Sequence, residues 1–117
     1  MILKLQEQLY KKLNINEIAS KASVYFQVPQ NSKFPYIFIG DFLSKDKSTK
    51  TSKLEEINFK ISIYFRDKNL RNMLMLSKEI RELLIADKIN FLEQRVSILN
   101  DSITYSINMQ FKTIQGD

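Results

Sequence analysis

The sequence predicts an α+β domain in which two helices pack on one face of a single, mostly antiparallel sheet of about five strands. Three observations predict it. Two stretches repeat apolar residues at helical spacing, and several shorter stretches are alternating or continuously apolar. The length of 117 residues is typical of one domain. The predicted order is helix, strand, strand, strand, helix, strand, strand, within a single domain spanning residues 1–117.

The first predicted helix spans about residues 2–13. Its apolar residues recur on one face: Ile2, Leu5, Leu9 and Leu13. A short helical turn is expected next, covering the core with Ile15, Ile18 and Ala19. A β-branched and aromatic strand follows at residues 23–28, and Pro29 ends it because proline has no amide hydrogen for a strand ladder.

The next two predicted strands form the centre of the sheet. Residues 34–40 are almost continuously apolar, which is typical of a strand covered on both faces, and the strand can extend through Leu43. Gly40 there indicates a bulge or a close backbone approach. The following strand alternates strictly, with one face made of Ile57, Phe59, Ile61, Ile63 and Phe65.

The C-terminal half is predicted as a helix and a hairpin. The helix covers about residues 69–87, capped by Asp67 or Asn69. Its apolar face is Leu70, Met73, Leu76, Ile80, Leu83 and Leu84. Strands at about 91–99 and 102–114 follow, joined by Asn100 and Asp101, which tolerate the positive φ of a tight turn. In the last strand, residues 104, 106, 108, 110 and 112 are polar and are expected to face water or a partner.

The composition argues against an enzyme. The chain has no cysteine and no histidine, which removes the usual zinc ligands, the thiol nucleophile and the usual general base. Only two glycines are present, so a glycine-rich phosphate loop is excluded. The carboxylate pairs Glu55/Glu56 and Glu79/Glu82 are interpreted as solvated surface. We therefore expect a soluble, non-catalytic protein with no cofactor, no metal and no membrane-spanning segment.

The positive charge is concentrated in one polar stretch, residues 44–53. The net charge is +5, and this stretch holds four lysines against Asp46 alone, so it contributes +3 of that charge. It is interpreted as a solvated, mobile loop joining two strands. The loop is either a floppy connection or an arm that becomes ordered on a neighbouring subunit or along a nucleic acid.

The alternating strand at residues 57–66 is the other candidate for nucleic-acid binding. Only Tyr64 shares its polar face with the basic residues Lys60 and Arg66. Single-strand binders stack bases on several aromatic side chains beside basic residues. One tyrosine is too few, so this face is interpreted as ordinary surface, as is Met75 on the polar side of the second helix.

Two segments resemble the signature of the phage tail-completion, or tail-terminator and head-tail joining, family. They are Val24-Tyr25-Phe26-Gln27-Val28-Pro29-Gln30 and Phe34-Pro35-Tyr36-Ile37-Phe38-Ile39-Gly40. The predicted order of elements is also similar to that family along essentially the whole chain. The resemblance implies that six signature residues hold the fold: Val28, Pro29, Phe34, Pro35, Tyr36 and Gly40.

The resemblance also implies a function. A ring, typically a hexamer, caps the finished tail tube, stops its growth and joins it to the head connector of a phage, prophage or gene transfer agent. Its partners are other copies of itself, the tube protein, connector proteins and DNA in the lumen, first in the host cytoplasm and then in the virion tail. The implied contact residues are Lys45, Lys47, Lys50, Thr51 and Lys53. The alternative is a small basic nucleic-acid-binding module that uses the same lysines.

Overall fold

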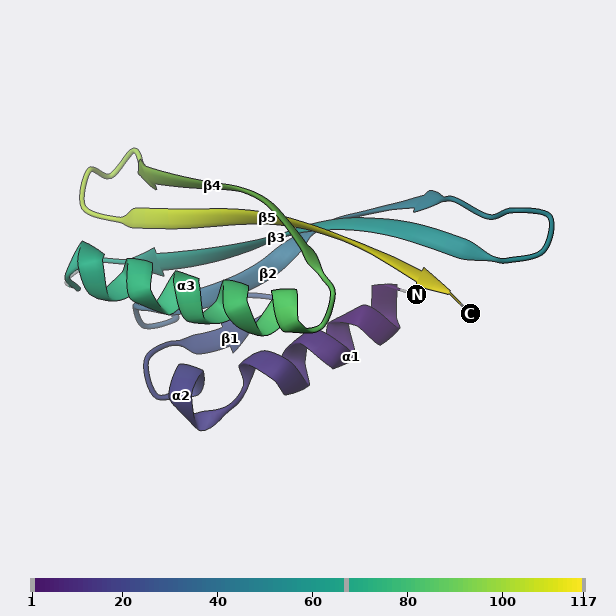
Figure 1. Cartoon of the computed structure of the whole chain (residues 1–117). Coiled ribbons are helices and arrows are strands. Elements are labelled where there is room, and N and C mark those ends of the chain that lie inside the picture. Colours follow the sequence, from purple (N-terminus) through teal and green to yellow (C-terminus); the bar gives the residue numbers. More distant parts are fainter. Residues whose placement is uncertain (1, 67, 117) are drawn as a thin grey trace.

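A computed structural model describes residues 2–66 and 68–116 (Figure 1). Its elements are α1 (Ile2–Leu13), α2 (Asn16–Ala19), β1 (Ser23–Tyr25), β2 (Tyr36–Asp46), β3 (Leu54–Phe65), α3 (Leu70–Ala86), β4 (Asn90–Ile98) and β5 (Tyr105–Gly116). The strands form one sheet in the order β1-β2-β3-β5-β4, and α1 and α3 lie on the same face of it (Figure 1). The predicted α+β class is confirmed.

Two details of the architecture differ from the prediction. β1 pairs with β2 in parallel, whereas the other three strand pairs are antiparallel. The expected helical turn is a third, short helix, α2. β1 also ends at Tyr25 rather than at residue 28, since only three of its residues pair with β2. A strand this short carries too little alternation to fix either its direction or its end.

The core lies between the sheet and the two long helices. The five odd-numbered apolar residues of β3 from Ile57 to Phe65 are all at most 2% exposed, as the alternation predicts. The helices contribute Leu5, Leu9, Leu13, Met73, Leu76, Ile80 and Leu84. Leu70 was predicted to join them, but it is 41% exposed because it begins α3 at the end of the sheet. Burying an apolar surface of this kind is the dominant stabilising term.

The start of α3 is fixed by an N-cap. The side chain of Asn69 accepts a hydrogen bond from the Arg71 backbone N–H at 2.7 Å. Such a cap satisfies one of the amide groups that have no partner within the helix. Of the two residues predicted to cap the helix, Asn69 is the one that does so. Asp67 lies outside the described residues.

The turn between β4 and β5 is longer than the predicted two-residue hairpin. β5 begins at Tyr105, and the positive φ falls on Ser102 rather than on Asn100 or Asp101. The Asp101 carboxylate instead organises the turn by accepting hydrogen bonds from the backbone N–H of Ile103 (3.0 Å) and Thr104 (2.8 Å). An Asp side chain that bonds the backbone two and three residues ahead closes a wider turn.

The face of the sheet opposite the helices is less exposed than predicted. Thr104 and Ser106 are buried although they were expected to face water, and Ser62 on β3 is also buried. The Ser62 hydroxyl donates to Asn108 Oδ1 at 2.7 Å, and Asn108 Nδ2 donates to Ser106 Oγ at 3.0 Å. The hydrogen bonds of these small side chains offset the cost of burying them.

The β2–β3 hairpin projects beyond the helices as an arm, residues 43–57 (Figure 1). Ser44 pairs with Ile57 and Asp46 with Glu55, so the predicted loop at 44–53 is shortened to residues 47–53. The strands continue through polar residues because the ladder is made by backbone groups. β5 follows the arm as far as the Leu54–Gly116 pair, which makes the arm three-stranded except at its tip.

Candidate interaction surfaces

The tip of the arm, residues 47–53, is closed by hydrogen bonds of its own. The Lys47 N–H donates to the Leu54 carbonyl at 2.9 Å, and the Thr49 N–H donates to the Ser52 carbonyl at 2.8 Å. Hydrogen bonds from the side chain and from the backbone N–H of Ser48 keep the pKa of Asp46 below its usual value. The tip is thus a folded turn of hydroxyl and lysine side chains.

The predicted contact residues do come together at this tip. Lys47, Lys50, Thr51 and Lys53 lie in it, Lys45 lies at the end of β2, and all five are exposed. Within the described residues, only Lys47 among the four lysines has an acidic partner, Glu56, at 3.9 Å. The arm therefore presents a group of positive charges far from the core, which can attract an acidic surface or a phosphate backbone.

The predicted signature residues gather instead near the start of β2. The Phe34 and Tyr36 rings lie 5.3 Å apart, the Tyr36 and Tyr64 rings lie 5.3 Å apart, and the Arg66 guanidinium sits 4.3 Å from the Phe34 ring centre. Burial is the main cause that raises the pKa of Tyr36, and Tyr64 adds to it. Tyr64 is the one aromatic residue that its own strand places on this face, as predicted, but the fold brings Phe34 and Tyr36 beside it from the segment that leads into β2. No periodicity within one strand could have shown this.

The remaining signature residues lie in or beside the loop that leads to β2. Val28 and Pro29 follow β1, and the Ser32 hydroxyl donates to the Pro29 carbonyl at 2.6 Å. Pro35 immediately precedes β2, after a cis Phe34–Pro35 peptide bond. Gly40 is buried, and a Cβ atom there would lie 2.5 Å from Phe38 Cζ. Both predictions for Gly40 are confirmed, because the register of β2 also shifts between Gly40 and Leu43.

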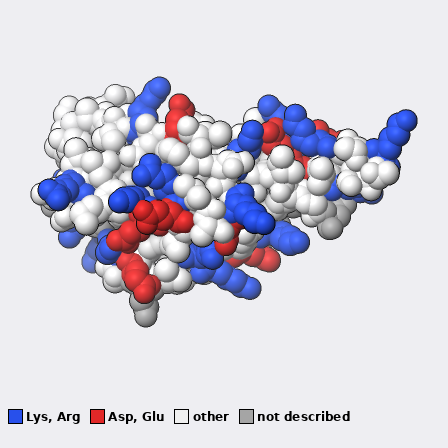
Figure 2. All heavy atoms as spheres, in the orientation of Figure 1, with Lys and Arg blue, Asp and Glu red and all other residues white. Residues whose placement is uncertain are grey.

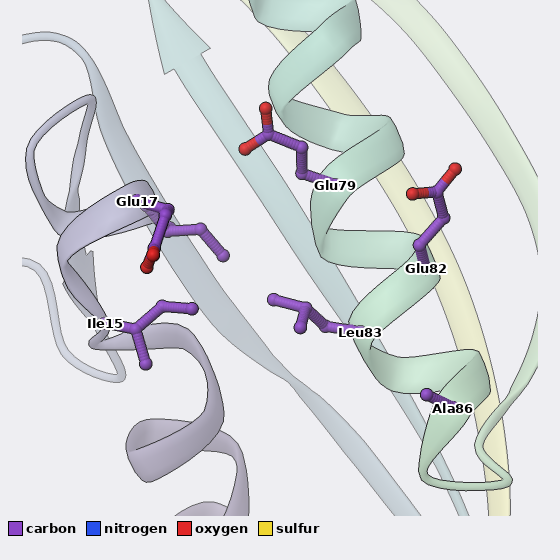
Figure 3. A pocket seen from close by; sticks show the side chains of 7 residues that line it. Ile15, Glu17, Glu79, Glu82, Leu83 and Ala86 are labelled. Carbon is purple, nitrogen blue, oxygen red and sulfur yellow. The ribbon is translucent and has the colours of Figure 1, made fainter.

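A groove of about 440 Å³ separates the short helix α2 from α3 (Figure 3). Ile15 and Leu83 point toward each other across it, and Glu79 and Glu82 stand along the α3 side (Figure 3). Lys21 Nζ bonds both Glu79 oxygens, at 2.8 and 3.0 Å. The Glu79 side chain stays 40% exposed in this ion pair, so it remains in contact with solvent as predicted. The groove offers an apolar floor and a neutralised carboxylate, which is not a set of groups for catalysis.

The other carboxylate pair also departs from the prediction. Glu55 and Glu56 are half-buried rather than fully solvated, and Glu56 lies 3.5 Å from Lys112 and 3.9 Å from Lys47. The Lys112–Glu56 pair links the arm to β5, whereas the Lys47–Glu56 pair lies within the arm. Across the described ranges 2–66 and 68–116, no group of three or more acidic, histidine or cysteine residues could hold a metal ion. No helix in those ranges has the length and apolarity to cross a membrane.

Comparison with known proteins identifies the family to which the chain belongs. A family model described as "Tail completion protein gp17" matches residues 4–116. The chain belongs to this family. The resemblance seen in the Phe-Pro-Tyr and Val-Pro segments is therefore confirmed, and the chain is a tail structural protein of the kind found in phages and gene transfer agents.

Comparison with solved structures shows a similar fold. A chain in a structure described as the virion of a native gene transfer agent particle superposes with a TM-score of 0.81. The match covers 93% of this chain and 92% of that one, at 17% sequence identity. At that identity the likeness shows a shared fold. No curated protein sequence gives a significant match.

Proposed function

We propose that the chain is a tail terminator, which forms a closed ring on the finished tail tube and joins it to the head connector. The family match over residues 4–116 carries the proposal, because a tail completion protein must meet the end of a tail. The protein then acts by binding rather than by catalysis. Copies would assemble in the host cytoplasm and remain in the virion of a phage, a prophage or a gene transfer agent.

The shape of the chain supports a ring. A closed ring needs heterologous contacts, in which one patch of each subunit meets a different patch of the next. β4 is an outer strand along its whole length, and β2 is unpaired on its outer side beyond its short pairing with β1. Open sheet edges of this kind are templates for association. A hexamer is the ring size that the family resemblance implies.

The arm is proposed to make contacts away from the body of its own subunit. Lys45, Lys47, Lys50, Thr51 and Lys53 are exposed at or near its tip, and few acidic groups neutralise them. They would meet a neighbouring subunit, the tube, the connector or the DNA that passes through the lumen. The signature cluster around Phe34 and Tyr36 would serve the fold, since its rings pack on one another.

A capping assay tests the proposal. Tail tubes purified without their terminator should stop elongating when the protein is added, and rings should be visible at the tube ends by electron microscopy. A tip variant with Lys45, Lys47, Lys50 and Lys53 changed to Ser should cap less well. A control variant with Lys4, Lys33, Lys68 and Lys78 changed to Ser has the same net charge, +5 − 4 = +1, and should cap normally. Tubes that continue to grow with the unmodified protein would refute the proposal.

The positive tip also favours a second candidate, a nucleic-acid-binding module. Binding through lysines weakens steeply with salt, because each phosphate contact releases counterions. On this alternative the protein would be retained on DNA at low salt, and the tip variant would show a shallower dependence of affinity on salt than the control variant. A protein that is not retained on DNA at low salt lacks this activity.

A further inference from the structure

The groove between α2 and α3 has an apolar floor and a rim of carboxylates (Figure 3). We call it the acidic groove, after Glu17 on its α2 side and Glu79 and Glu82 on its α3 side. Ile15 and Leu83 face each other across the floor, and every lining residue is either apolar or acidic. Such a lining suits a side chain that is apolar along its length and positively charged at its end.

Two of the three carboxylates on this rim are free to meet a partner. Glu79 is not, because Lys21 Nζ already bonds both of its oxygens. Glu17 is exposed and has no ion-pair partner within residues 2–66 and 68–116. Glu82 lies 3.9 Å from Lys78, but these side chains are 63 and 66% exposed. An exposed pair within one helix is weak, so Glu82 can exchange it for another cation.

The tip of the arm carries side chains that match the lining of the acidic groove. Lys50 lies between Thr49 and Ser52, whose backbone hydrogen bond closes the turn, so Lys50 is at the outer end of the arm. A lysine packs its methylene stem on apolar surface and keeps its ammonium group with polar partners. The tip contains no arginine, the side chain whose planar fork best fits the oxygens of a phosphate. These features favour a protein surface with carboxylates over a nucleic acid.

A copy of the protein cannot fill its own acidic groove. The arm points away from α2, and its tip lies at the opposite end of the molecule (Figure 1). β5 pairs with the arm as far as Leu54, so the arm is a three-stranded extension that does not fold back as a loose loop would. A tip lysine that enters the groove must therefore come from a second copy.

We propose that the arm tip of one copy docks in the acidic groove of the next copy. The stem of Lys50 packs on Ile15 and Leu83, and its ammonium group meets Glu17 and Glu82. The tip and the groove are different surfaces at opposite ends of the molecule, so the contact is heterologous and repeats from copy to copy. The inference rests on the proposed ring and names a contact between its neighbouring subunits.

Two variants that each damage one surface isolate a single contact. The tip variant defined above lacks the tip lysines and keeps the groove. A groove variant, Glu17→Lys with Glu82→Lys, keeps the tip and repels it from the groove. When the unlabelled groove variant is added to the ¹⁵N-labelled tip variant, amide signals of Ile15, Glu17 and Leu83 should shift. With the labels exchanged, signals of residues 49–52 should shift. NMR detects millimolar affinities, so the contact can be seen without the cooperativity of a ring.

Reversing the charges on both surfaces tests their pairing. Lys50→Glu with Lys53→Glu should abolish self-association and tube capping, and the groove variant should do the same. Combining all four substitutions in one chain should restore both activities, because the attraction returns with its signs exchanged. Arg95→Glu is the matched control: Arg95 is exposed beside Asn108, on the sheet face opposite the helices, and its reversal should change neither activity. A tip that binds only DNA or the tube would not be rescued by substitutions in the groove.

The outcomes separate this inference from the proposed function. Absent shifts at millimolar concentration overturn the contact, as do tip signals that move on addition of duplex DNA but not of the tip variant. If the groove variant caps tail tubes as well as the unmodified protein, the ring stands and this contact is wrong. If the tip and groove variants associate but the unmodified protein does not cap tubes, the contact stands and the proposed function is wrong.

Discussion

The two ends of the sheet differ in what they offer a partner. At one end the arm carries four lysines on a hydrogen-bonded turn, and at the other end the β4–β5 turn exposes Ile98 and Ile103 beside the core (Figures 1 and 2). A lysine attracts an oppositely charged group over about a Debye length, roughly 8–10 Å at physiological salt. Apolar side chains stabilise only what they touch. On the proposed function, the arm would attract a partner from a distance, whereas the β4–β5 turn would stabilise only a surface that contacts it directly.

The largest expected effect tests whether the core extends to the end of the sheet where β4 turns into β5. Phe65→Ala removes the buried ring on which Tyr105 stacks. Replacing a buried Phe by Ala lowers the free energy of unfolding by about 3–5 kcal/mol, from lost transfer energy and the cavity left behind. Chemical denaturation measures it. Tyr64→Ala, one residue away on the half-buried outer face, should cost clearly less, and equal losses would mean that the core does not extend to this end.

A smaller effect is expected where the arm leaves the body. Gly40→Ala places a Cβ 2.5 Å from Phe38 Cζ, so the ring must move. Overpacking of this kind costs about 1–3 kcal/mol of unfolding free energy. Gly116→Ala is the matched control at the other end of the arm, because its Cβ would meet nothing closer than 3.7 Å. If Gly40→Ala and Gly116→Ala have the same free energy of unfolding, the Phe38 ring moves away from the new Cβ without cost.

The two turns can be compared by their pH dependence. Hydrogen bonds from the Thr104 hydroxyl and from the Ile103 and Thr104 amides, with Arg66 nearby, lower the pKa of Asp101 from 3.8 to about 2. A depressed pKa in the folded state means that the ionised carboxylate stabilises the fold. This contribution is complete above about pH 4 and declines as the pH falls toward 2.

Variants of the two turn aspartates measure this contribution. The difference in unfolding midpoint between the unmodified protein and Asp101→Asn should be constant above about pH 4 and shrink toward pH 2. Asp46→Asn in the arm should show the same trend with a smaller difference, since only Ser48 donates to Asp46. A difference that grows with acidity would contradict the assigned hydrogen bonds.

The smallest effect is expected at the tip of the arm. Changing Lys45, Lys47, Lys50 and Lys53 to Ser should alter the free energy of unfolding by no more than about 0.5 kcal/mol, because exposed residues outside the packed core contribute little. The same variant should lose partner binding. Thermal unfolding and the capping assay, run on the same sample, separate the two. A strongly destabilised variant would mean that the tip packs on its own subunit.

Sequence periodicity predicted the elements well where apolar residues repeat. The bounds of α1 were predicted as found, α3 and β4 were each predicted to within one residue at either end, and the inward face of β3 was right residue by residue. Errors arose where the chain is polar or the element short. The arm strands extend into the predicted loop at 44–46, and the Asp101 turn is wider than expected, because backbone and side-chain hydrogen bonds leave no apolar repeat to detect.

The candidate surfaces also differ in whether the sequence alone could predict them. The lysines at 45–53 could be found from the sequence because they are neighbours in the chain. The exposure of Val96 and Ile98 could not, because it depends on the place of β4 at the edge of the folded sheet. The aromatic cluster needed residues from two separate segments, Phe34 and Tyr36 from one and Tyr64 from the other.

By itself, then, the sequence determined the helices, the alternating strands, the α+β class and the family, since each depends on residues close together along the chain. Only the tertiary structure decided that β1 runs parallel to β2, that the arm stands clear of the helices and that one end of the core stays uncovered. The physical reason is that local periodicity sets which side of an element is apolar. What finally covers that side depends on elements distant in the chain.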